Sequence, residues 1–194
     1  RRGVGEAGLY NQRRWGSMDC MNTRITVLLT VLLLLAMPAG LFAAAYDPLL
    51  PLLVDIAGWQ GEKAEGIDLS QAGMQGVTVV REYKSGGKGL TAAIMLGSQV
   101  GITWTPEYKE GFKALTEEGS LEVRKINGFL AYTAYNKDSA SGGIVVLLIE
   151  ATPDKPDSGA LLVVSFDDMP LDEGLKLAQK FDWKRIKDAA AKVK

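Results

Sequence analysis

The chain of 194 residues contains no histidine and a single cysteine, Cys20. Without histidine, Ser-His-Asp triads, Cys-His pairs, histidine-ligated zinc and imidazole proton shuttles are all excluded. One cysteine can form neither an internal disulfide nor a four-thiolate metal site. These absences close most histidine- and thiol-dependent catalytic classes, so we expect a protein without a cofactor and without enzymatic activity.

The chain also lacks an excess of charge of either sign. It carries 22 Lys and Arg against 23 Asp and Glu, for a net charge of −1. Binding to nucleic acid depends on clustered basic residues that neutralise phosphates, so we expect no nucleic-acid partner. The length supports one domain.

A secretory signal is the most specific feature of the sequence. Arg24 precedes an apolar run, Ile25–Met37, and small residues follow at Ala43 and Ala45. This order of a positive, an apolar and a small-residue region is typical of a cleaved signal peptide. We therefore expect cleavage after Ala45 and a periplasmic or secreted protein.

A retained anchor is the alternative to cleavage. No charged residue occurs in the 22 positions from Ile25 to Tyr46, a length that just spans a bilayer. In that case residues 25–46 tether an accessory protein to the membrane, and this is the only reading that gives it a membrane partner.

The chain is expected to divide into four segments: an upstream stretch (1–20), a signal peptide (21–45), an extended lead-in (46–61) and a single domain (62–194). Cleavage after Ala45 would remove five Arg and two acidic residues, which leaves 17 basic and 21 acidic residues and a net charge of −4.

Alternating apolar residues and turn signals predict a series of strands over residues 62–70, 76–84, 89–97, 120–126, 129–137, 144–149 and 160–165. Asn127-Gly128 is the favoured dipeptide of a two-residue hairpin turn. Residues 144–149 are apolar without alternation, which indicates a central strand covered on both faces.

Three helices are expected. Thr105 and Pro106 form a helix start signal, and the spacing of the apolar residues that follow, Tyr108, Phe112 and Leu115, predicts a helix over 106–117. Pro170 and Asp182 each begin a further helix near the C-terminus. The fold class is therefore α+β, with an antiparallel sheet of about six or seven strands and helices on both faces.

Several short segments carry a resemblance to a known group of proteins: Gly58-Trp59, Arg81-Glu82-Tyr83, Asn127-Gly128 and the stretch Phe166–Trp183. In these the chain resembles small exported bacterial proteins of unknown function, and its order of elements is similar to the Mog1/PsbP-like single-domain fold. That resemblance implies an antiparallel sheet between helices and an accessory or binding role.

Aromatic residues are the first candidates for a ligand groove, because binding pockets are mostly apolar with a few polar groups. The candidate set is Trp59, Arg81, Tyr83, Trp104, Tyr132 and Tyr135. Arg81 could hold an anion, or it could form an ion pair with Glu82 or with a neighbouring strand. Packing in the core or at its rim is the alternative for the aromatic side chains.

Four carboxylates in seven positions, Asp167, Asp168, Asp172 and Glu173, are the candidates for a divalent metal site. Calcium prefers six to eight oxygen ligands. As the alternative, Asp167 and Asp168 would cap the helix after Pro170, and all four acids would favour its positive end.

The functional expectation is an exported, soluble, non-catalytic domain that binds an envelope protein or a small molecule. Two alternatives stay open. One is a hydrolase that uses paired carboxylates, with or without a divalent cation. The other is the membrane-tethered accessory protein.

Overall fold

The computed structural model describes residues 44–104, 109–152 and 154–193. Ala44–Lys194 form one compact unit. The predicted signal segment lies outside the described residues except for its last two positions, so it stays a prediction. Among the described residues, no helix has the length and apolar character needed to cross a membrane.

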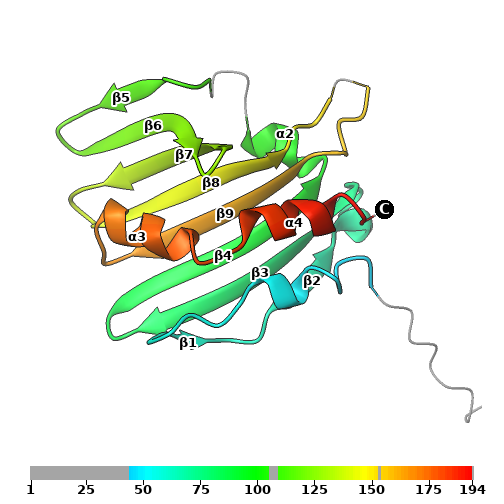
Figure 1. Cartoon of the computed structure of the whole chain (residues 1–194), viewed down its shortest axis with the longest axis horizontal. Coiled ribbons are helices and arrows are strands. Elements are labelled where there is room, and N and C mark those ends of the chain that lie inside the picture. Colours follow the sequence, from blue (N-terminus) through cyan, green and yellow to red (C-terminus); the bar gives the residue numbers. More distant parts are fainter. Residues whose placement is uncertain (1–43, 105–108, 153, 194) are drawn as a thin grey trace, which may run out of the picture. The chain divides into compact units, whose positions relative to one another are not determined.

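A nine-stranded antiparallel sheet is the centre of the unit (Figure 1). Its strands are β1 (Gln60–Gly61), β2 (Glu65–Asp68), β3 (Gly76–Ser85), β4 (Lys88–Gly97), β5 (Lys113–Leu115), β6 (Gly119–Ile126), β7 (Phe129–Asn136), β8 (Ser141–Ile149) and β9 (Ala160–Asp167). The spatial order is β1-β3-β4-β9-β8-β7-β6-β5, and β2 also pairs with β3. The last strand, β9, is therefore inserted between β4 and β8.

Local hairpins account for most of this order. β3 and β4 form one hairpin, and β6, β7 and β8 follow as a meander. Asn127 and Gly128 have φ angles of 51° and 84°, the left-handed values that a type I′ turn requires. The predicted hairpin is thus confirmed, and its turn residues are ones that adopt positive φ at low cost.

One face of the sheet holds the main core. The helices α3 (Leu171–Ala178) and α4 (Trp183–Ala190) lie across it, with the short 3₁₀ helix η1 (Leu50–Leu52) of the lead-in near the edge formed by β1 and β2 (Figure 1). Asp182 caps α4 by accepting a hydrogen bond from the Arg185 N–H at 2.9 Å. The apolar side chains of α4 are buried, namely Trp183, Ile186 and Ala190. Both C-terminal helices were predicted correctly.

The lead-in belongs to the same core. Leu49, Leu53 and Ile56 are buried, and Trp59 packs against the core from a half-buried position. The packing of Trp59 agrees with the core-packing alternative given for the aromatic candidates.

The strand count differs from the prediction of six or seven. The structure adds β5 at one edge of the sheet, and β1 and β2 at the other edge replace the single strand expected over 62–70. A 3₁₀ turn, η2 (Leu69–Ala72), ends that segment. All the additional strands are two to four residues long, too short to show an apolar period.

The helix predicted over 106–117 is wrong for the residues that the structure describes. Residues 105–108 lie outside the described part, and β5 occupies 113–115. Gly111 has a φ of 88°, which ends any right-handed helix there, and Leu115 is 67% exposed. Pairing with β6 outweighs the helical spacing of the apolar residues in this segment.

A helix does occur just before that segment, as α2 (Gln99–Thr103). Its Val100 is buried and packs with Val145 and Leu161 on the second face of the sheet. The long helices lie on the first face, so the prediction of helical layers on both faces stays a prediction.

Candidate functional site

The six residues predicted for a ligand groove are divided between the two faces of the sheet. Arg81, Tyr83 and Tyr135 point to the first face, where Trp59 also packs. Trp104 and Tyr132 belong to the second cluster, around Val145 and Leu161. The structure therefore offers two separate regions rather than one groove.

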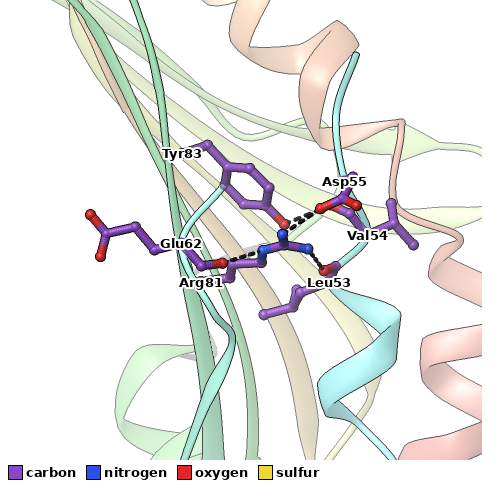
Figure 2. Close-up of polar contacts among 6 residues, drawn as sticks. All are labelled: Leu53, Val54, Asp55, Glu62, Arg81 and Tyr83. Carbon is purple, nitrogen blue, oxygen red and sulfur yellow. Dashed lines mark hydrogen bonds and ion pairs between the residues drawn. The ribbon is translucent and has the colours of Figure 1, made fainter. Parts of the chain in front are cut away.

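Arg81 and Tyr83 hold the lead-in against β3 (Figure 2). The Arg81 guanidinium donates from Nε to the Glu62 carbonyl at 2.7 Å and from Nη1 to the Leu53 carbonyl at 2.6 Å, and Nη2 pairs with Asp55. The Tyr83 hydroxyl donates to the Val54 carbonyl at 2.9 Å. All these acceptors come from residues 53–62, far from β3 in sequence.

This arrangement makes Arg81 a structural residue. Its side chain is 15% exposed, and its guanidinium carbon lies 5.1 Å from the centre of the Tyr83 ring. The donors that would bind an anion are already directed at two carbonyls and one carboxylate. The pair therefore anchors the lead-in, and the acidic partner of Arg81 is Asp55 of the lead-in, rather than Glu82 or a residue of a neighbouring strand.

Tyr83 makes the fold sensitive to alkaline pH. Burial raises its pKa to about 12, above the ordinary value of 10.0, because a buried phenolate is poorly solvated. In the unfolded chain the phenol ionises near pH 10, so its contribution to stability is complete below pH 10 and is lost as pH rises toward 12. The free energy of unfolding is therefore expected to fall more steeply between pH 10 and 12 in the wild type than in Tyr83→Phe.

Urea unfolding at pH 9, 10 and 11 measures this difference. At pH 9 the Tyr83→Phe protein should be less stable by about 1 kcal/mol, for the lost hydrogen bond. Parallel pH profiles for the two proteins would contradict the assigned cause, since every other titrating group is shared.

The second face of the sheet carries a continuous row of apolar side chains. Strand register places Val80, Ala93, Val163, Val145, Tyr132 and Val123 side by side across β3, β4, β9, β8, β7 and β6. We call this row the apolar band. Val145 and Val123 are buried, whereas the other four are half-buried.

The rows on either side of the apolar band differ in polarity. Toward α2, Met95, Leu161 and Leu147 are paired and apolar, and Val100 packs on them. In the other direction the next row contains Glu82, Thr91 and Ser165. The band thus lies between a short helix and a polar margin, on the face of the sheet opposite the two long helices.

A pocket of about 460 Å³ lies where β3 and β4 meet the end of α4. Its polar lining includes Asp68, Ser70, Asp157 and Ser158, and its apolar lining includes Val77, Leu96 and Ala190. None of the six predicted groove residues contributes to it. The pocket joins positions far apart in the chain, so no local sequence signal could have found it.

The chemistry of this pocket favours binding over proton transfer. Asp68 accepts a hydrogen bond from the Ser70 N–H at 2.9 Å, and this bond lowers the pKa of the Asp68 carboxyl. A general acid needs the opposite shift, toward neutral pH. Asp68 therefore stays an ionised turn cap.

The four carboxylates predicted as a metal site are not gathered around one point. Asp167, Asp168 and Asp172 are exposed, and Glu173 pairs with the Lys88 ammonium at 2.6 and 2.7 Å. In the described part of the chain, no cluster of three or more His, Cys, Asp or Glu residues could hold a metal ion.

The capping role considered for Asp167 and Asp168 is wrong. The N-cap of α3 is Pro170, which makes no side-chain capping bond. Met169 turns into the core and its N–H bonds the Ala140 carbonyl at 2.9 Å, which separates the two aspartates from the helix start. Asp172 and Glu173 do lie in the first turn, where the helix dipole favours them.

Comparison with protein-family models, with curated proteins and with solved structures finds no match for this chain.

Proposed function

We propose that this chain is an exported, non-catalytic binding domain whose partner is an envelope protein that docks on the apolar band. The observation that carries the proposal is the half-buried state of Val80, Ala93, Val163 and Tyr132 on the face opposite the long helices. An antiparallel sheet face that meets only water normally alternates to polar residues. Contiguous apolar surface of this kind marks interaction sites.

The docked partner would complete the cover of the sheet. We expect helical cover on both faces, and Val100 of α2 packs at one end of the second face. The five residues of α2 reach the part of the second face around Leu161. The partner would bury apolar surface on the rest of the band, at Val80, Ala93 and Val163.

Site-specific photo-crosslinking tests this proposal in the cells that make the protein. A photoreactive amino acid at Val163 or Val80 is expected to give one discrete adduct. The matched control carries it at Lys184, an exposed position of α4 on the opposite face. Equal adducts from both faces, or none from the band positions, would contradict the docking role.

The hydrolase alternative has one supporting observation, because Asp68 and Asp157 line the same pocket. Glycosidases need one carboxyl group of raised pKa beside a second carboxylate. The lowered pKa of Asp68 removes that residue as the acid. A small envelope ligand held by the polar and apolar lining of the pocket is the second candidate function. Native mass spectrometry of the gently isolated protein tests it by the presence or absence of added mass.

A further inference from the structure

The outer surface of the C-terminal helices is strongly basic. Exposed carboxylates occur in this segment at Asp172, Asp182 and Asp188, but exposed cations are twice as many: Lys176, Lys180, Lys184, Arg185, Lys187 and Lys192. We call this set the basic helical surface. The apolar residues of α4 face the sheet, so its cations point away from the core.

Most of these cations are available to an outside partner. Of these six cations, only Lys184 pairs with a carboxylate among the described residues: its ammonium lies 3.0 Å from the Asp188 carboxylate. Lys187 lies 5.8 Å from the centre of the Phe129 ring. The other four make no ion pair in the described part of the chain.

The positive charge is concentrated in the C-terminal helices, whereas the rest of the folded unit is acidic. Residues 46–170 contain 10 basic and 17 acidic residues, whereas residues 171–194 contain seven basic and four acidic residues. A net charge of −7 is therefore followed by +3 in the last 24 residues. Such asymmetry orients a molecule with its basic side toward an anionic surface.

The start of the folded unit lies beside this surface. Ala45 lines the pocket together with Ala190, Ala191 and Val193, at the C-terminal end of α4. The uncharged stretch Ile25–Tyr46 leads directly to this point in the sequence. A retained stretch would therefore join the folded unit next to the end of α4.

We propose that the basic helical surface binds the anionic headgroups of a lipid membrane. The charge complementarity and the position of Ala45 independently select the same side of the unit. Exposed Lys and Arg close to an anionic leaflet bind additively, and their attraction is screened by salt. The surface thus orients the domain with α4 toward the membrane and leaves the apolar band, on the opposite face of the sheet, directed away from it.

Vesicle sedimentation of the full chain tests the proposal with phosphatidylcholine vesicles and with vesicles containing phosphatidylglycerol. The measured quantity is the ratio of the two partition coefficients, which cancels any binding through the apolar stretch. Neutralisation of Lys176, Lys180 and Lys192 to Gln is expected to lower this ratio about a hundredfold, at about fivefold for each cation. Raising the salt from 50 to 500 mM should remove most of the wild-type preference.

The matched control neutralises Lys63, Lys113 and Lys155, three exposed lysines outside the helices, with the same change in net charge. It should retain most of the preference for phosphatidylglycerol. An equal loss in both triple variants would reduce the effect to net charge and overturn the proposal. A wild-type ratio near one, or binding to a soluble polyanion but to neither vesicle, would overturn it as well.

Discussion

Replacing Arg81 with methionine is expected to lower the free energy of unfolding by about 3 kcal/mol, because hydrogen bonds from a charged donor contribute about 1.5–3 kcal/mol each and a buried acceptor left unpaired costs about 1–3 kcal/mol. Methionine keeps an unbranched apolar stem but removes every donor. The Leu53 carbonyl, in a residue that is 1% exposed, then loses its partner. Urea unfolding at neutral pH measures the change.

The control for Arg81 separates the two carbonyl bonds from the ion pair. Asp55 is 89% exposed on its side chain, so Asp55→Asn should cost less than about 1 kcal/mol. Hydrogen exchange should increase in the lead-in of Arg81→Met before it increases in β8 and β9. A large effect of Asp55→Asn together with a small effect of Arg81→Met would show that the ion pair, rather than the carbonyl bonds, holds the lead-in.

The elements that were predictable from the sequence are those whose information is local. Asn127-Gly128 fixes a hairpin through its own backbone preferences, and Asp182 starts α4 through a bond to a residue three positions away. The apolar run in β8 indicated burial on both faces, and Ile144 and Val145 are buried on opposite faces. The α+β class followed from these segments alone.

The sites were less predictable because they depend on distant contacts. Arg81 reaches acceptors 19 to 28 positions away, and a sequence pattern around Arg81 and Tyr83 cannot distinguish such anchoring from anion binding. The apolar band is a row across six strands, so it appears only when strand order and register are known. The same holds for the pocket, because it forms where Ala45 lies close to the end of α4.

Phe166 packs between α3 and the sheet. It is 1% exposed and stacks on Tyr135, with ring centres 6.3 Å apart. Its ring occupies space left by two glycines: a Cβ built on Gly142 would lie 2.7 Å from the ring, and one built on Gly174 of α3 would lie 2.6 Å from it. Phe166→Ala is therefore expected to cost about 3–5 kcal/mol of unfolding free energy, measured by urea unfolding.

A double-mutant cycle between Phe166 and Gly174 tests whether the ring itself requires glycine in the helix. Gly174→Ala alone should destabilise by about 1–2 kcal/mol, since overpacking outweighs the gain of about 1 kcal/mol in helix propensity. In the Phe166→Ala background the clash is absent, so the same change should stabilise by up to about 1 kcal/mol. Gly101→Ala in α2, where a Cβ meets no atom within 4 Å, is the matched control and should have the same small effect in both backgrounds. If Gly174→Ala has one sign in both backgrounds, the glycine is required by something other than Phe166, and the close approach of α3 to β9 would have another cause.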